Sequence, residues 1–231
     1  CCTLPMTPPM SAERQFVREQ FDGIDVRGSR LIADRVLERC TISICHARAK
    51  NHLKRPVFRR ILLKECRLVS TDAHGAVFDD CTVDGLRTNR LSIITGCAFR
   101  HVTLRGDVGQ FLIRGAADLE PDRLDGANLE FYNAVDWALD IRDVRATTLD
   151  IRNVPLHLIR RNPETQAIVR KARLPYEEML RLGLGPTATQ LLSTFFPDDP
   201  EERLFVAGVR SKTYDRWLDA FAQLRRAGLA H

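Results

Sequence analysis

The sequence predicts a mainly β solenoid with four short sides, followed by an α-helical C-terminal region. Apolar residues recur at every fifth position, large aromatic residues return about every 20 residues, and a series of helix-start signals follows residue 160. An α-helix has a period near 3.6 and a strand a period of 2, so neither keeps a strict five-residue apolar phase. A coil whose four sides are each five residues long does keep it.

The clearest five-residue phase runs without a slip over nine positions: Leu119, Leu124, Leu129, Ala134, Leu139, Val144, Leu149, Val154 and Ile159. With three one-residue slips, the phase extends back to Phe21 through residues that include Leu31 and Leu53. The interval 104–119 fits least well, and there we expect Phe111 and Ile113 to point inward. The phase therefore predicts coils over 21–160, about six to seven of them.

Every fourth step returns to the same side of the coil: Leu37, Phe58, Phe78, Phe99, Leu119, Leu139 and Ile159. Repeats of this length are typical of stacked units in which each coil contacts its neighbours. The residue two positions before each phase residue should also point inward, because side chains alternate along a strand. Five of the seven cysteines occupy such positions: Cys40, Cys45, Cys66, Cys81 and Cys97. Small thiols suit a narrow apolar core. The seven cysteines also lack the short, dense spacing of a secreted disulfide scaffold, so reduced cysteines and a cytoplasmic location are expected.

Charged residues give an independent test of this stacking. Residues that follow equivalent phase positions become neighbours at a strand spacing of about 4.8 Å, where opposite charges stabilise the sheet. One series alternates in sign throughout: Lys64, Asp84, Arg105, Asp125 and Arg145. A second series breaks once, between Glu120 and Asp140: Arg59-Arg60, Asp79-Asp80, Arg100-His101, Glu120, Asp140 and Arg160-Arg161.

Two five-residue units, Ala117-Asp118-Leu119-Glu120-Pro121 and Ala127-Asn128-Leu129-Glu130-Phe131, follow the pattern Ala-(Asp/Asn)-Leu-x-x. The chain thereby resembles the pentapeptide-repeat proteins over residues 21–160, with most other units degenerate. The resemblance implies a right-handed quadrilateral β-helix; another kind of parallel β-helix is the alternative. It also implies a non-catalytic binding protein. Some members of that family imitate DNA and bind type II topoisomerases such as gyrase, usually as end-to-end dimers.

The two ends of the chain differ from the repeats. Residues 1–20 are predicted to be an N-terminal extension or cap with one short helix over 11–20. Residues 161–231 are predicted to be an α-helical cap, with helix starts at Asn162-Pro163-Glu164, Pro186-Thr187, Asp199-Pro200-Glu201-Glu202 and Ser211. Asn or Asp before Pro, with acids in the first turn, is a typical helix start. This cap could also supply a homodimer contact.

Composition and motifs indicate neither a membrane span nor an enzyme. The 231 residues carry a net charge of +5 and include no apolar run of about 18 residues, and Cys1-Cys2-Thr3-Leu4-Pro5 does not read as an intact signal peptide. Cys40, Cys45, His46 and His52 match no metal-ligand spacing. His74, His101 and His157 have no evident partner, and no phosphate-binding loop is present. We therefore expect no catalytic residue, metal or cofactor.

The strongest surface feature is a basic cluster, which includes a predicted loop over 48–55: Arg48, Lys50, Lys54, Arg55, Arg59, Arg60, Lys64 and Arg67. Residues 37–74 hold nine basic and three acidic residues, whereas residues 115–159 hold four basic and nine acidic ones. The leading hypothesis is a scaffold that presents a charged surface to a protein partner. The alternatives are binding of nucleic acid or an anionic surface through 48–67, a DNA-mimic contact with gyrase, and an effector or toxin-neutralising adaptor.

Overall fold

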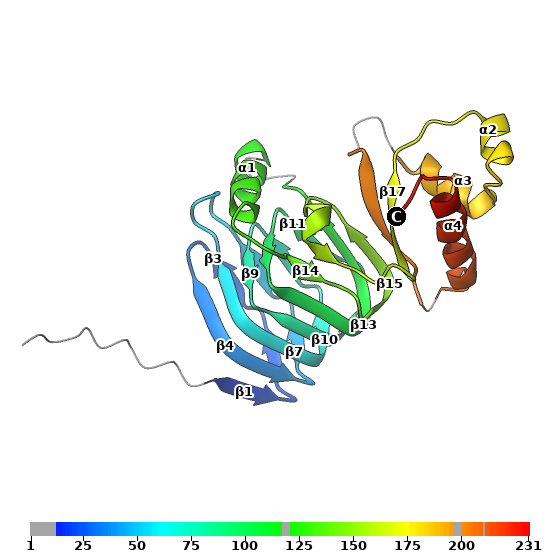
Figure 1. Ribbon diagram of the computed structural model, residues 1–231. Helices are drawn as coiled ribbons and strands as arrows, with labels where there is room; N and C mark the ends of the chain where they lie inside the picture. Colours follow the sequence, from blue (N-terminus) through cyan, green and yellow to red (C-terminus); the bar gives the residue numbers. More distant parts are fainter. Residues whose placement is uncertain (1–12, 117–120, 196–199, 210) are drawn as a thin grey trace, which may run out of the picture.

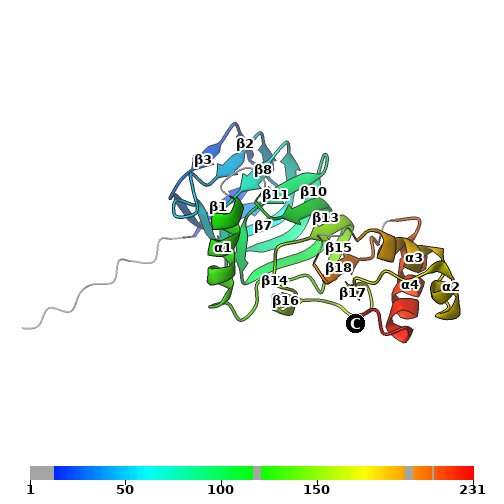
Figure 2. The ribbon, with the colours of Figure 1, turned by 90° about the horizontal axis from the view of Figure 1, so that it is seen from above.

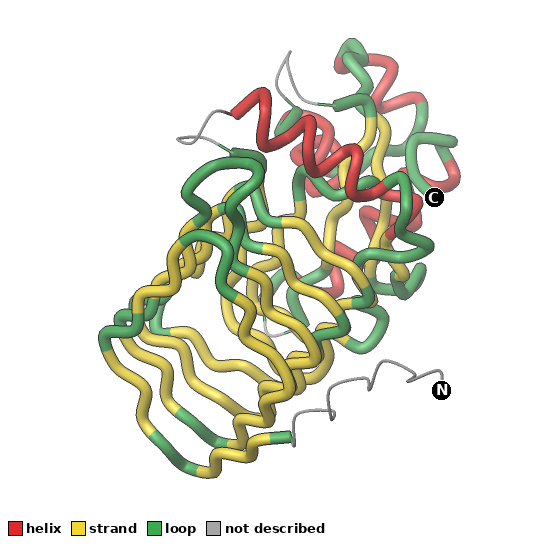
Figure 3. Tube along the Cα trace, turned by 90° about the vertical axis from the view of Figure 1, so that its left-hand side faces the viewer, coloured by secondary structure: helices red, strands yellow, loops and turns green. Residues whose placement is uncertain are grey.

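The computed structural model describes residues 13–116, 121–195, 200–209 and 211–231. Within these ranges the chain is mainly β, and sixteen strands form one sheet whose pairs are parallel. The sheet curls around an apolar interior as an open half-barrel, with a smaller helical unit beside it (Figures 1 and 3). The predicted mainly β class and the parallel pairing are thus confirmed.

The curled sheet contains β1 (Arg14–Val17), β2 (Gln20–Asp22), β3 (Asp25–Arg27), β4 (Leu31–Glu38), β5 (Thr41–Ser43), β6 (His46–Arg48), β7 (Val57–Val69), β8 (Asp72–His74), β9 (Val77–Asp79), β10 (Thr82–Thr88), β11 (Ser92–Thr95), β12 (Ala98–Arg100), β13 (Val102–Arg114), β14 (Leu139–Asp140), β15 (Val144–Ile151) and β16 (Ile159–Arg160). The remaining elements are α1 (Pro121–Tyr132), the 3-10 turn η1 (Leu156–Leu158), β17 (Gln166–Arg170), α2 (Tyr176–Arg181), α3 (Pro186–Ser193), β18 (Glu202–Val206) and α4 (Tyr214–Arg226). Figure 2 shows the helical unit alongside the β13 and β15 end of the sheet.

The predicted aromatic column is present. Phe58 is in register with Phe78, and Phe78 is in register with Phe99. The rings stack with centroids 5.2 Å and 5.7 Å apart and with interplanar angles of 14° and 10°. Aromatic pairs on neighbouring strands add to the stability of a sheet, so this column helps to fix the strand register.

Left-handed backbone occurs at a five-residue spacing along the best-formed part of the sheet. The residues with positive φ there are Arg60, Glu65, Ser70, Gly75, Asp80 and Gly85. Each one lies two positions after an inward-phase residue, where the chain changes direction. A positive φ is unfavourable for residues other than glycine, so its regular recurrence reflects a turn that the curled backbone requires.

The cysteines lie in the interior, as predicted, and all five in the described ranges are buried and unpaired. Their thiols also link neighbouring strands. Cys66 Sγ donates to the carbonyl of Leu37 at 3.2 Å, and Cys81 Sγ donates to the carbonyl of Phe58 at 3.4 Å. A thiol is a weak donor, so the cysteine combines small size with satisfaction of a backbone acceptor.

The five-residue phase predicted around residues 119–134 is wrong, because α1 occupies residues 121–132. Leu124, Asn128 and Tyr132, spaced by four, form its buried face, whereas Leu129 is 63% exposed. Proline suits the first helical position because it lacks the donor that would be unpaired there. The Ala127-Asn128-Leu129 unit is therefore helical, and Ala117-Asp118-Leu119 falls outside the described residues. From Leu139 to Ile159 the predicted phase residues are buried.

Two more expectations inside the repeat region are wrong. Leu31 and Leu53 were expected to point inward, but they are 61% and 78% exposed. Ile32 is in register with Phe58, and Leu37 is in register with Leu63. The one-residue slip therefore falls before Ile32 and not after Leu31, and Leu37 is not the expected neighbour of Phe58. Leu53 belongs to a loop between β6 and β7 that interrupts the phase.

Both ends contain strands where helices were expected. The strands β1 and β2 occupy 14–22, so the short N-terminal helix is not formed over the described part of 11–20. The helix start at 162–164 is also wrong: Asn162 Oδ1 accepts a hydrogen bond from the Glu164 amide at 2.9 Å, which makes a turn. The strands β17 and β18 then form an antiparallel pair, and β18 replaces the helix expected after Pro200.

The other two helix starts are confirmed. The helix α3 begins at Pro186, and α4 runs over 214–226 with Arg225 and Arg226 in its last turn. Phe221 and Leu224 are fully buried in a second core shared with β17 and α3. The C-terminal region is thus a small mixed unit, and its strand β18 lies against β15 of the curled sheet.

Candidate interaction surface

The eight basic residues of the predicted cluster are distributed over β6, β7 and the loop between them. Four of them form ion pairs with acids on neighbouring strands: Arg48 with Asp72 at 4.0 Å, Arg59 with Asp79 at 2.7 Å, Arg60 with Asp34 at 2.6 Å and Lys64 with Glu38 at 3.5 Å. These pairs neutralise much of the positive charge that the sequence places here. The cluster is therefore less basic than a count of residues suggests.

Arg55 is turned inward and is not part of an exposed patch. Its Nε donates to the carbonyl of Gly75 at 2.6 Å, and its Nη2 donates to those of Ala76 at 3.2 Å and Gly96 at 3.3 Å. Burial disfavours the charged guanidinium and lowers the pKa of Arg55. This side chain therefore fastens the loop to two turns of the curled sheet, which the sequence pattern did not indicate.

Residues 49–56, which we call the anchored loop, form a compact projection. The amides of Leu53 and Lys54 donate to Asn51 Oδ1 at 3.1 Å and 2.8 Å, a turn that asparagine commonly stabilises. The Ala49 amide donates to the carbonyl of His74 at 2.8 Å, and Pro56 is fully buried. Both ends and the turn of the loop are thus fixed by hydrogen bonds or packing.

The tip of the anchored loop carries an apolar residue between two exposed lysines. Leu53 is 78% exposed, the most exposed large apolar side chain of the described residues. Lys50 and Lys54 flank it and form no ion pair with the described residues. Arg67 of β7 is exposed and unpaired among the described residues as well. Apart from Arg55, which bonds backbone carbonyls, the three cations of the cluster without an acidic partner among the described residues therefore lie at the loop and beyond it on β7.

The outer wall of the sheet carries a ladder of ion pairs. Asp79 is 1% exposed and accepts from Arg59 Nε at 2.7 Å and Arg100 Nε at 2.6 Å. The Arg100 hydrogen bond, with help from Arg59, holds the pKa of Asp79 below its ordinary value despite the opposing effect of burial. Arg105 and Asp84 form a second rung at 2.8 Å. The predicted alternation of charge is confirmed at these rungs.

The predicted series fails further along the sheet. Asp125 belongs to α1 and not to a strand, so it does not follow Arg105 in the ladder. Arg145 instead pairs with Asp107 at 3.2 Å. The helix inserted between β13 and β14 breaks the regular spacing on which the prediction depended.

His101 has two acidic partners, contrary to expectation. Its Nε2 lies 2.6 Å from Asp136 and its Nδ1 lies 3.0 Å from Asp80. The Asp136 hydrogen bond, followed by that to Asp80, raises the pKa of His101 above its ordinary value. The imidazole also lies beside Trp137, with ring centroids 4.9 Å apart. The Arg160 guanidinium lies over the Trp137 ring, with its Cζ atom 4.2 Å from the ring centroid. Asp136 and Trp137 follow α1, so the helix insertion creates this contact.

A cleft of about 930 Å³ lies between α1, residues 151–157 and the β17–β18 pair. Asn153 Nδ2 donates to Asp125 Oδ1 across it at 2.8 Å. Its cations are balanced by acids, as in the Arg170–Glu202 pair at 3.1 Å. Sequence reasoning missed this cleft because its walls come from segments separated by up to about 80 residues.

The described residues contain no group of three or more histidine, cysteine or acidic side chains that could hold a metal ion. His46 lies 2.9 Å from Asp72. Burial raises the pKa of the Cys97 thiol to about 12, which leaves it unreactive. Among the described helices, none combines the length and apolar content that a membrane span requires.

These features describe a rigid parallel β framework from which one anchored loop projects an apolar tip with two free lysines. No family model, curated protein or solved structure matches the chain.

Proposed function

We propose that the protein is a non-catalytic interaction protein whose anchored loop docks into a macromolecular partner, most simply another protein. The observation that carries this proposal is the contrast within the loop: its base is held by Arg55 and Pro56, whereas Leu53 at its tip is 78% exposed. An exposed apolar residue on a rigid support costs little conformational entropy when a partner covers it. At protein interfaces, a few side chains packed into desolvated pockets contribute most of the affinity.

The partner surface would have an apolar pocket bordered by acids. Leu53 would fill the pocket, and Lys50 and Lys54 would face the acidic rim. Charges at an interface rim mainly increase the association rate and its dependence on salt. The ion-paired outer wall favours a protein over a polyanion as the partner, because Arg59, Arg60 and Lys64 already have acids beside them.

We further propose that the framework is a right-handed solenoid of the pentapeptide-repeat type. Two observations support this: positive φ recurs every five residues from Arg60 to Gly85, and parallel partners such as Phe58 and Phe78 are 20 residues apart. A solenoid would hold the anchored loop at a corner between two coils. It would thereby explain how an insertion is tolerated without loss of the strand register.

The test compares proteins captured by the immobilised full chain from a lysate of the cells that produce it. Leu53→Ser removes the apolar tip, and Leu129→Ser serves as a matched control because Leu129 is an exposed leucine on α1. A partner retained by the wild type and by Leu129→Ser but lost with Leu53→Ser supports the proposal. Identical capture by all three proteins contradicts it.

Nucleic-acid binding is distinguished by its salt dependence. A protein that neutralises several phosphates loses affinity steeply as salt rises. Titration of a fluorescent DNA duplex and a single strand, each at two salt concentrations, measures this directly. Tight, salt-sensitive binding lost on joint substitution of Lys50, Lys54 and Arg67 would replace the protein-docking proposal with the nucleic-acid alternative.

A further inference from the structure

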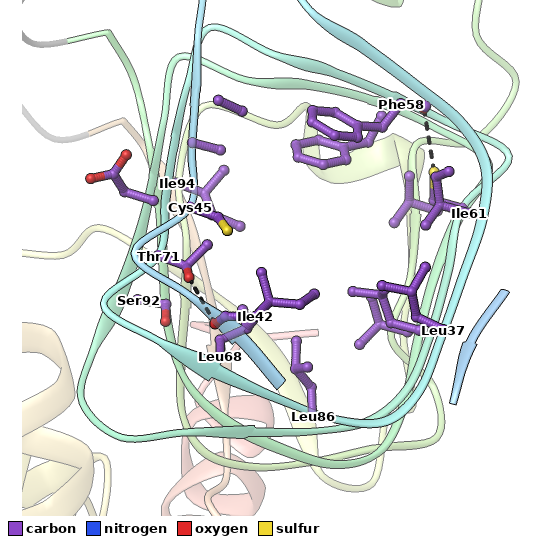
Figure 4. A pocket seen from close by; sticks show the side chains of 18 of the residues that line it. Leu37, Ile42, Cys45, Phe58, Ile61, Leu68, Thr71, Leu86, Ser92 and Ile94 are labelled. Atoms are coloured by element: carbon purple, nitrogen blue, oxygen red, sulfur yellow. Dashed lines mark hydrogen bonds between the residues drawn. The ribbon is translucent and has the colours of Figure 1, made fainter. Parts of the chain in front are cut away.

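The interior of the curled sheet is not completely filled. It contains an apolar cavity of about 390 Å³ whose walls include the Phe58–Phe78 stack, Leu37 and Ile61 (Figure 4). This volume lies within the range of roughly 300–1,000 Å³ that is typical of ligand pockets. Apolar side chains line most of the surface, so the cavity suits an apolar ligand or an apolar part of one.

The cavity reaches the edge of the sheet formed by β1, β2 and β3, each of which pairs with one strand only. Phe16 and Phe21 line it from this edge and are only half-buried. Ile24 also lines the cavity and is 43% exposed. An inward residue with that exposure marks an opening, so a ligand could enter from the β1–β3 edge.

One set of residues in register on neighbouring strands changes from charged at this edge to apolar in the interior. Arg14 of β1 is in register with Arg35 of β4, which is in register with Ile61 of β7. Arg35 lines the cavity, and residues in register on neighbouring parallel strands project to the same side. Arg14 is exposed and is not part of the cavity wall, so the two arginines are register neighbours at the opening, with only Arg35 bordering the apolar interior.

This arrangement is unfavourable without an anion. Like charges directly opposite each other on neighbouring strands destabilise a sheet, and no acid among the described residues pairs with either arginine. Arg35 Nη1 donates to the carbonyls of Ala33 and Asp34 at 2.6 Å and 3.0 Å. The Asp34 carboxylate itself forms an ion pair with Arg60 at 2.6 Å. The cation pair is thus left without a counterion in the described protein.

We propose that the cavity binds an anionic amphiphile, with a long-chain carboxylate as the simplest example. The carboxylate would lie between Arg14 and Arg35, where a guanidinium can donate two parallel hydrogen bonds to it. The hydrocarbon chain would extend along Ile61 and Leu37 toward the phenylalanine stack. The charged headgroup would thus contact the arginines, and the hydrocarbon chain would contact the apolar side chains of the interior.

The test is calorimetric titration of the full chain with dodecanoate, below its micelle concentration, and with dodecanol as the uncharged control. One dodecanoate should bind per chain, at least tenfold more tightly than dodecanol. Affinity should rise about fourfold for each methylene added from octanoate upward until the cavity is full. Equal binding of dodecanoate and dodecanol, or no binding of dodecanoate, would overturn the proposal without any variant.

Two variants locate the headgroup. Arg35→Met keeps the length of the side chain but removes its charge, and should weaken dodecanoate binding about 10-fold to 100-fold while dodecanol binding is unchanged. Arg216→Met on the exposed face of α4 is the matched control and should have no effect. Binding at several sites that is insensitive to Arg35→Met would overturn the proposal. So would light scattering that shows a dimer from which dodecanoate is excluded, since a second copy would then occupy the opening.

Discussion

Asp79 and Arg100 are joined by two hydrogen bonds, of 2.6 Å and 2.7 Å, across neighbouring strands although 21 residues separate them in the chain. Arg59 approaches the same carboxylate from the strand on its other side at 2.7 Å. One nearly buried acid therefore connects three successive strands. The contact shows how the outer wall holds the strand register that positions the anchored loop.

Replacing Asp79 should weaken the sheet. Asp79→Asn keeps the shape but removes the charge that both arginines contact, so the free energy of unfolding should fall by about 1–3 kcal/mol. Urea unfolding followed by circular dichroism measures this. Asp84→Asn is the control, because Asp84 is more exposed than Asp79 and has one arginine partner, Arg105. This control substitution should lower the free energy of unfolding by less than about 1 kcal/mol. Equal losses in the two variants would contradict the role given to Asp79.

His101 should make stability depend on pH. Because Asp136 and Asp80 raise its folded pKa above the ordinary value of 6.5, protonated His101 stabilises the fold most fully below that pH. The contribution is lost as the pH rises through the folded pKa. The difference in unfolding free energy between the wild type and His101→Gln should therefore be larger in acid than in alkali. An NMR titration of the imidazole that gives a pKa at or below 6.5 would contradict this account.

The two leucines of α1 should respond differently to truncation. Leu124 packs over Gly75 and Gly96, where an added Cβ would come within 3.3 Å and 2.8 Å of it. Leu124→Ala should thus leave a cavity and cost about 2–5 kcal/mol. Leu129→Ala should stay within about 0.5 kcal/mol, because that side chain faces solvent. Comparable costs in urea unfolding would instead favour a coil in which both leucines point inward.

Arg55 should control the rigidity of the anchored loop. Arg55→Met removes the donors to Gly75, Ala76 and Gly96, so the loop should open more often. Trypsin should then cleave after Lys50 or Lys54 several-fold faster, as followed by mass spectrometry of the fragments. Arg67→Met, which removes an exposed basic residue of β7, should leave these rates unchanged. Cleavage that is equally slow in Arg55→Met would show that other contacts hold the loop.

Much of the curled sheet could be predicted because its interior repeats. The column Phe58, Phe78 and Phe99 and the inward thiols of Cys66 and Cys81 follow directly from a five-residue phase and the alternation of side chains. The prediction from the five-residue phase is wrong where the same segment also has apolar residues at a helical spacing of four. Leu124 and Leu129 continue a spacing of five, but Leu124, Asn128 and Tyr132 follow a spacing of four, and packing against the sheet selects the helix.

The candidate site was predicted only as a set of basic residues. Their acidic partners depend on the register, and the anchored loop lengthens the sequence separation between partners: Arg60 pairs with Asp34, 26 residues earlier. The sequence predicts a surface cation at Arg55, because its three carbonyl acceptors come from turns about 20 and 41 residues away. Such long-range partners leave no local pattern in the sequence. The exposed tip, Leu53, was misassigned for the same reason, since the phase assumed no insertion.

The most direct test of the docking proposal places a photo-crosslinking amino acid at position 53 in cells that produce the protein. Position 129, another exposed leucine position outside the anchored loop, carries the same group in the control. The account predicts a discrete protein adduct from position 53 that is absent from position 129. No adduct from position 53, or the same adducts from both positions, would contradict it.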